Sequence, residues 1–292
     1  MLPARWRLAV IAVALTFGVT GGVITSLGQA LAARPAVAAS GHRPTRPARP
    51  VAAKVARRAA AGKAPLVTDV PSRSKHGLAA PKVTQLMRLA NRLKQAKARA
   101  FLSRAQVPAT RMLAATAQPQ VRNYFCGPAA VSEMLAQVGV KVSQLAAARQ
   151  LGTNTSGTDW SDVSGYPVPK VLNSHQRKTS YVAVPLPWVP TRAQVSTFKK
   201  DLVTDLNKGA GVPLAGNAYE VPGGPHLVGH PAGQQIMHWF DIRGYAKSGA
   251  ITSYEDSVHS APSIAWSTSV PAYSSLPTAT VVDIVGARGY VW

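Results

Sequence analysis

Apolar residues recur every three or four positions in the first part of the C-terminal region, a spacing typical of helices that bury one face. Four helices are predicted from this spacing, at 127–137, 142–150, 169–175 and 191–208. The last has the clearest stripe, which consists of Val195, Phe198, Leu202 and Leu206. A glycine follows it, and Gly209 is therefore expected to end the helix.

Segments with strand-like composition follow the helices. They lie at 212–219, 238–246, 250–257 and in the closing segment 286–292. The second and third are separated by a short turn that contains glycine, which predicts a β-hairpin. Helices followed by an antiparallel sheet indicate an α+β protein. We therefore expect one α+β domain over 112–292, which is long enough for a single hydrophobic core.

The first 39 residues have the pattern of an export signal. Arg5 and Arg7 precede a long uncharged run, 8–33, and two A-x-A cleavage motifs lie at 30–32 and 36–38. The expected product is a secreted or extracellular protein. An N-terminal membrane anchor is the alternative, because the uncharged run is longer than the core of a usual signal peptide.

Two further segments precede the domain. Residues 40–82 are rich in Ala, Pro, Arg and Lys, so they are predicted to form a disordered basic linker. The segment 83–111 begins with a basic amphipathic helix that carries Leu86, Leu89 and Leu93 on one stripe. This helix is interpreted either as a pro-segment that shields the domain or as part of a spacer.

The basic character of the chain belongs to its front third. Residues 1–111 contain 20 of the 33 Lys and Arg residues and one acidic residue, whereas the remainder carries 13 basic and 10 acidic residues. We expect electrostatic contact of the front segment with anionic cell-wall polymers or a membrane surface. The domain itself has no basic stripe with interleaved aromatic residues and no phosphate-binding glycine loop, so no nucleic-acid partner is expected.

Cys126 is the only cysteine in the chain. Gly127 and Pro128 follow it, and an apolar helical stripe begins at Val131, so the cysteine is expected at the N-terminus of a buried helix. The partial positive charge at that end favours a thiolate. Gln120 lies just upstream, where an amide donor could bind an oxyanion. The pattern predicts a nucleophile, and a buried inert thiol is the alternative.

A cysteine nucleophile needs a base, and the predicted hairpin supplies one. His238 begins one strand and Asp256 ends its partner 18 residues later, so both are expected at the same edge of the sheet. An acid in that position can orient the imidazole, and the imidazole can stabilise the thiolate. Glu133 and Asp241 are competing candidates for the acid, although Asp241 is expected on the opposite face of its strand.

These residues resemble the C39-like cysteine peptidases, which have a papain-like fold. The resemblance rests on Gln120, the run Tyr124-Phe125-Cys126-Gly127-Pro128-Ala129, Gly211 to Leu214, His238-Trp239, Gly244-Tyr245 and Asp256. It implies that Cys126 is the nucleophile, His238 the general base and acid, Asp256 the orienting acid and Gln120 the oxyanion donor. The implied activity is peptide or amide hydrolysis through a thioester. The chain departs from the family pattern at Met237, where glycine is frequent, and at Ser257, where proline is common.

The remaining histidines point to no cofactor. His226 and His230 lie among glycines and prolines rather than on a helix, so no metal site is expected, and one of them is expected to contact substrate from a mobile loop. We expect a monomer that acts on a peptide or protein. Two alternatives are a papain-like module that only binds, and acyl transfer to an acceptor other than water.

Overall fold

The computed structural model describes residues 80–162 and 164–292. The predicted export signal at 1–39 and the predicted linker up to residue 79 lie outside the described residues. Among the helices in the described part of the chain, none combines the length and the hydropathy needed to cross a membrane.

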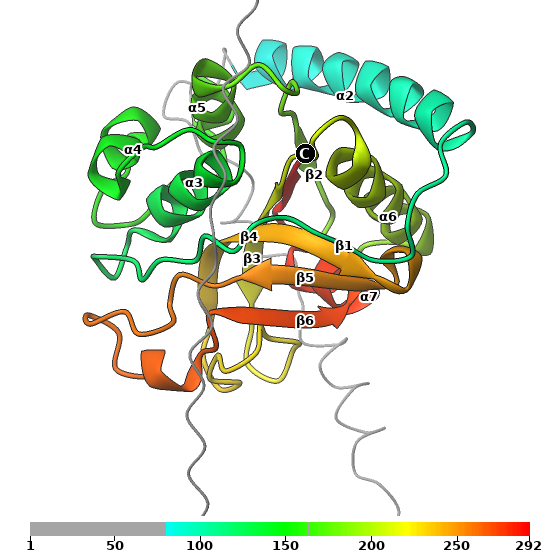
Figure 1. Cartoon of the computed structure of the whole chain (residues 1–292). Coiled ribbons are helices and arrows are strands. Elements are labelled where there is room, and N and C mark those ends of the chain that lie inside the picture. The colour runs from blue at the N-terminus through cyan, green and yellow to red at the C-terminus, as the bar shows by residue number, and fades with distance from the viewer. Residues whose placement is uncertain (1–79, 163) are drawn as a thin grey trace, which may run out of the picture. The chain divides into compact units, whose positions relative to one another are not determined.

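The helices predicted in the domain are confirmed, with their ends shifted by one or two residues (Figure 1). The α-helices are α2 (Ala80–Leu102), α3 (Cys126–Gln137), α4 (Gln144–Leu151), α5 (Pro167–His175), α6 (Arg192–Asn207) and α7 (Thr278–Ile284). Thr191 caps α6 in a reciprocal pair with Gln194, which satisfies two of the free N–H groups at the helix start. Helix α7 was not predicted, since its seven residues are too few for a clear period.

The described residues form one antiparallel sheet of seven strands, in the order β2-β7-β3-β4-β5-β6, with β1 paired to β4. The strands are β1 (Arg111–Met112), β2 (Ala183–Pro185), β3 (Leu214–Glu220), β4 (Ile236–Ala246), β5 (Ile251–Glu255), β6 (Tyr273–Pro277) and β7 (Gly289–Val291). The predicted hairpin is the β4–β5 pair. Its turn uses positive φ angles at Lys247, Ser248 and Gly249.

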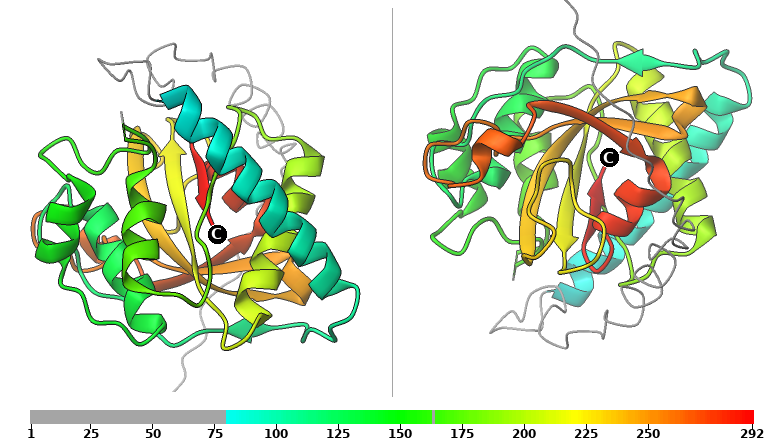
Figure 2. Two further views of the ribbon diagram at one scale, coloured as in Figure 1. Left: turned by 90° about the horizontal axis from the view of Figure 1, so that it is seen from above. Right: turned by 90° about the horizontal axis from the view of Figure 1, so that it is seen from below.

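Side chains of the central strands alternate between two hydrophobic cores, as expected for a sheet covered on both faces. Leu214, Phe240 and Ile242 belong to one core, which also holds residues of α6 and α7. Ala215 and Trp239 belong to the other core, which holds residues of α3, α4 and α5. Figure 2 shows these two groups of helices on opposite sides of the sheet.

Helix α2 contacts the domain with a different face from the predicted one. Of the predicted stripe, Leu86, Leu89 and Leu93 are exposed, at 67%, 54% and 57%, and only Ala90 packs against the core. The contacting face combines apolar residues, among them Ala98, with polar ones. Lys94 Nζ lies 2.7 Å from Asp205 Oδ2 on α6, and Trp292 Nε1 donates to Asn91 Oδ1 at 2.8 Å. The docked face thus buries apolar surface of α2 and also gives two buried polar groups of the domain the partners they need.

The docking position of α2 is on the side of α6. Trp292, which contacts α2, follows Val291, and Val291 pairs with Ala215 on β3. His238 pairs with Ala218, three residues further along the same strand. Three residues of a strand span about 10 Å, so this contact lies away from His238. The role of α2 as a pro-segment stays a prediction.

Candidate active site

Cys126 is the first residue of α3, as predicted, and is partly exposed. The N-cap residue Phe125 has no side-chain capping hydrogen bond, so no side chain competes there for the first N–H groups of the helix. Backbone hydrogen bonds from Gly127 and Trp239 reach the sulfur. The helix start thus presents a thiol to backbone donors that favour its ionised form.

His238 and Asp256 lie at the same end of the β4–β5 hairpin, as their spacing predicted. His238 Nε2 is 3.0 Å from Asp256 Oδ1, and both residues are buried. The same carboxylate oxygen accepts a 2.9 Å hydrogen bond from the N–H of Val258. Burial alone would raise the pKa of Asp256, but the positive charges of His238 and His230 and the hydrogen bond of His238 hold it far below its usual range.

Cys126 and His238 stabilise each other's charged forms. Burial raises the pKa of the Cys126 thiol, but the hydrogen bond and charge of His238 outweigh it, so the pKa is lower than that of an ordinary cysteine. Burial lowers the pKa of His238, but Asp256 and Cys126 raise it well above the usual value. Because Nε2 is directed at Asp256, Nδ1 is the ring nitrogen left for the sulfur. This arrangement favours a thiolate–imidazolium pair.

A loop between α4 and α5 packs against the start of α3. Trp239 Nε1 donates to the carbonyl oxygen of Thr158 at 3.1 Å, and Trp160 stacks on the Trp239 ring with centroids 5.6 Å apart. A Cβ atom on Gly127 would lie 2.3 Å from Thr158 Oγ1. Glycine therefore allows this loop to approach the helix immediately after Cys126.

Gln120 is buried beside the residue that follows Asp256. Its backbone N–H donates to Ser257 O at 2.8 Å, and the Ser257 hydroxyl donates to Gln120 Oε1 at 3.2 Å. Gln120 Nε2 donates to Arg122 O at 2.8 Å. Since a carboxamide nitrogen carries two hydrogens, one remains for another acceptor. Ser257 thus orients the Gln120 amide.

A second histidine contacts Asp256, and the sequence did not predict this contact. His230 Nε2 lies 3.0 Å from Asp256 Oδ2, as an ion pair rather than an aligned hydrogen bond. Its Nδ1 lies 2.8 Å from Glu220 Oε2. His230 is therefore buried beneath the site rather than held out toward substrate. The nitrogens of His226 each lie 3.0 Å from a carbonyl oxygen of its own loop.

Two groups of side chains in the described residues place potential metal-ligand atoms within 4.8 Å of one another. They are His230, His238 and Asp256, and Glu133, Asp241 and Glu255. In the first group the histidine nitrogens already pair with Asp256, and a metal would have to replace those contacts. The second group contains both competing acids, so these lie with Glu255 rather than beside His238.

The three acids of the second group connect α3 to the sheet. Burial, together with repulsion by Glu255, raises the pKa of both Glu133 and Asp241 well above the usual carboxyl range. Glu133 Oε2 and Asp241 Oδ1 have no hydrogen-bond partner among the described residues. Neutral, protonated carboxyls are the form that suits such an environment.

Glu133→Gln is expected to stabilise the fold at alkaline pH. The folded state binds protons at these acids that the unfolded chain releases, so the free energy of unfolding falls as pH rises from about 4 toward the raised pKa values. An amide at this position cannot ionise and still accepts from the N–H of Gln118. We expect a gain of about 1 kcal/mol at pH 8, or about 2–4 °C in melting temperature, and a smaller gain at pH 5.

Urea unfolding of the wild type and the variant at both pH values measures this difference. Asp162→Asn is the matched control, because Asp162 lies outside the acid cluster and an amide oxygen can still accept the 2.6 Å hydrogen bond from the N–H of Ser164. The control should show no gain. Equal gains for Glu133→Gln at pH 5 and pH 8 would contradict the protonated-carboxyl interpretation.

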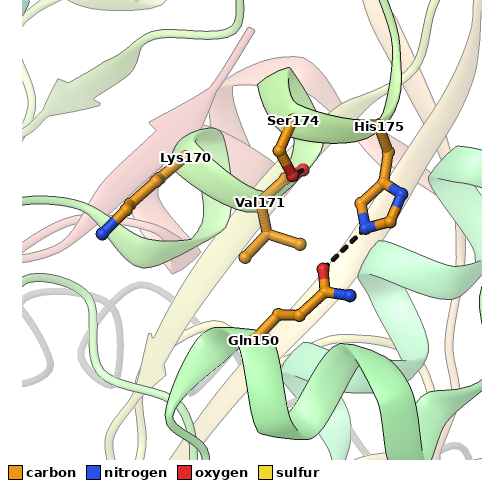
Figure 3. Close-up of a pocket in the computed structure, with 5 residues that line it drawn as sticks. All are labelled: Gln150, Lys170, Val171, Ser174 and His175. Carbon is orange, nitrogen blue, oxygen red and sulfur yellow. Dashed lines mark hydrogen bonds between the residues drawn. The ribbon is translucent and has the colours of Figure 1, made fainter.

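A surface hollow between α4 and α5 lies apart from these groups (Figure 3). It is lined by Gln150, Lys170, Val171, Ser174 and His175. His175 Nε2 is 2.6 Å from Gln150 Oε1; Gln150 is exposed and His175 is half-buried. None of the residues predicted for the site lines this hollow.

Comparisons with known proteins give the chain a family context. The family model described as "Peptidase_C39 like family" matches residues 112–273. Among solved structures, the chain is similar to the peptidase domain of Streptococcus ComA, a bifunctional ABC transporter involved in a quorum sensing pathway. That match has 13% identity and a TM-score of 0.37, and covers 61% of this chain and 97% of the other. No curated protein matches the chain.

Proposed function

The chain belongs to the C39-like peptidase family, with the predicted α+β, papain-like fold class, and on this premise we propose that it is a secreted cysteine peptidase or amidase. The observation that carries the proposal is the continuous chain of contacts from Cys126 through His238 to Asp256. A thiol with a lowered pKa beside a buried imidazole and acid is what nucleophilic catalysis by cysteine requires.

Each residue has a chemical role in the proposed reaction. The Cys126 thiolate attacks the scissile carbonyl carbon, and the developing oxyanion accepts hydrogen bonds from the Cys126 N–H and Gln120 Nε2. The C–N bond breaks as the His238 imidazolium gives its proton to the leaving amine, which leaves a thioester on Cys126. His238 then removes a proton from water, and the water oxygen bonds to the thioester carbon. The C–S bond breaks and releases the Cys126 thiolate. Asp256 holds the imidazole in place throughout.

The proposed place of action is outside the cytoplasm. This part rests on the pattern of the first 39 residues, in which Arg5 and Arg7 precede an uncharged run. The basic front segment would hold the monomeric enzyme near an anionic wall or membrane surface, while the domain acts on peptide or protein substrates.

Iodoacetamide labelling tests the proposed nucleophile and needs no substrate, since the reagent reacts with the thiolate itself. Because the pKa of the Cys126 thiol is lowered mainly by His238, the wild type should be alkylated rapidly below the pH at which ordinary thiols react. His238→Gln should move the pH profile up toward that of a free thiol. The labelling rate is measured by mass spectrometry of the intact chain across the pH range.

His226→Gln is the matched control, since both ring nitrogens lie 3.0 Å from carbonyl oxygens of the same loop. Its labelling profile should coincide with that of the wild type. Ordinary thiol behaviour in the wild type would overturn the proposed nucleophile and favour a papain-like module that only binds.

A further inference from the structure

His230 and Glu220 form a buried charged pair directly behind Asp256. The side chains of both residues have no exposed surface, and His230 Nδ1 lies 2.8 Å from Glu220 Oε2. The other ring nitrogen faces Asp256 Oδ2 at 3.0 Å. Glu220 is itself fixed, because its Oε1 accepts a 2.8 Å hydrogen bond from the N–H of Leu227. The pair is therefore built into the end of β3 and the loop that follows it.

The contacts of His230 determine its protonation state. An ionised carboxylate can only accept hydrogen bonds, so Nδ1 donates to Glu220. A lone pair on Nε2 would face the negative Asp256 Oδ2 at 3.0 Å and be repelled, so a hydrogen on both nitrogens is favoured. Burial lowers the pKa of His230, but the interactions with Asp256 and Glu220 outweigh that effect and raise it above the usual value. The geometry thus describes an imidazolium rather than a neutral imidazole.

The surroundings of His230 come from four parts of the fold. The titratable groups in contact with it are Glu220 on β3, His238 on β4 and Asp256 after β5. Tyr254 on β5 interacts with Asp256 and Glu220, and His259 Nδ1 lies 2.6 Å from Asp256 O. The His238 ring centroid lies 5.3 Å from that of His230. The indole of Trp266 covers the ring at 4.9 Å and adds no charge.

We propose that His230, kept cationic by Glu220, is a positioning residue of the peptidase reaction that fixes the second oxygen of Asp256 and limits how strongly His238 retains its proton. The inference rests on the proposed function, since it assigns a role in that reaction. Asp256 attracts the His238 proton, whereas a second cation 5.3 Å away repels it. A general acid works best when its pKa lies near the operating pH. The repulsion by His230 limits the rise that Asp256 causes in the pKa of His238, and this helps His238 to give its proton to the leaving amine.

The pH dependence of the site distinguishes this role from simple packing. Removal of a nearby positive charge makes both the Cys126 thiol and the His238 imidazolium harder to deprotonate. In His230→Gln, the iodoacetamide labelling profile of Cys126 should therefore move to higher pH by roughly one unit. The ¹⁵N NMR titration of His238 in the full chain should move in the same direction. A residue that only fills space would leave both midpoints unchanged.

A second variant addresses the risk that His230→Gln leaves Glu220 buried and unpaired. The double substitution His230→Gln with Glu220→Gln replaces the ion pair with two amides that can hydrogen-bond each other and Asp256. The neutral pair should preserve folding and show an upward shift that is smaller than in His230→Gln, because the loss of the more distant Glu220 charge acts in the opposite direction. Unchanged midpoints in this folded double variant would overturn the proposal, even if the rate falls uniformly.

A measurement on the wild-type chain distinguishes failure of this proposal from failure of the proposed function. The ¹⁵N signals of His230 should show both ring nitrogens protonated at pH 7, whether or not Cys126 is reactive. A neutral His230 would overturn the positioning role while leaving the nucleophile assignment intact. Conversely, an imidazolium at His230 together with an unreactive Cys126 would overturn the proposed function, and with it the catalytic purpose of the pair.

Discussion

Replacing Cys126 with serine is expected to abolish turnover of a fluorogenic peptide library, by a factor on the order of 10⁴ or more. The site lowers the pKa of a thiol, but a hydroxyl has a much higher starting pKa and remains protonated beside the same histidine. Serine has nearly the shape of cysteine, so α3 should keep its start. Initial rates at substrate concentrations above and below KM measure the loss.

The control for this variant is its stability. Cys126 is partly exposed and is the first residue of its helix, and serine is accepted at such positions. The urea midpoint should therefore match that of the wild type within error. Residual turnover above about one tenth of the wild-type rate, in a preparation without wild-type protein, would contradict the assignment of Cys126 as nucleophile.

The geometry of the site followed from local patterns in the sequence. The helix start at Cys126 could be predicted because glycine, proline and an apolar stripe follow the cysteine. The contact between His238 and Asp256 could be predicted because a hairpin fixes which residues share an end, and they lie 3.0 Å apart. Strand alternation predicted that Asp241 points away from the side of β4 that carries His238, and Asp241 lies with Glu133 and Glu255 and contacts Gln137 on α3.

The contacts that the sequence did not predict involve segments without a periodic pattern of apolar residues. His230 lies in a loop of glycines and prolines, so nothing local indicates that it turns inward to Asp256. One signal was available, because Glu220 ends an apolar strand and a buried carboxylate needs a partner. The docked face of α2 could not be predicted for a related reason. Asn91 and Lys94 lie on it, and their partners, Trp292 and Asp205, are far away in the sequence.

The strands at the edges of the sheet also could not be predicted from local patterns in the sequence. The closing strand was predicted, but its place between β2 and β3 depends on pairings with distant residues. Strand β6, at Tyr273–Pro277, alternates between exposed and half-buried positions and contains two serines, so its composition resembles that of a loop. It is a strand because its backbone pairs with β5 along its whole length.

Asp256→Asn is expected to reduce kcat/KM by about 10³–10⁴-fold, less than Cys126→Ser, because the acid orients and charges the base without reacting itself. Burial lowers the pKa of His238, and Asp256 is the main group that opposes this effect. An amide removes that attraction, so the imidazolium should lose its proton at lower pH and the alkaline limb of the kcat/KM profile should move to lower pH.

Asp241→Asn is the matched control: it is a buried aspartate on the strand of His238, and it contacts Gln137 rather than the histidine. The control should keep both limbs of the profile and gain stability at alkaline pH. An equal loss of activity in the two variants, with both folded, would show that Asp256 matters to the sheet rather than to His238.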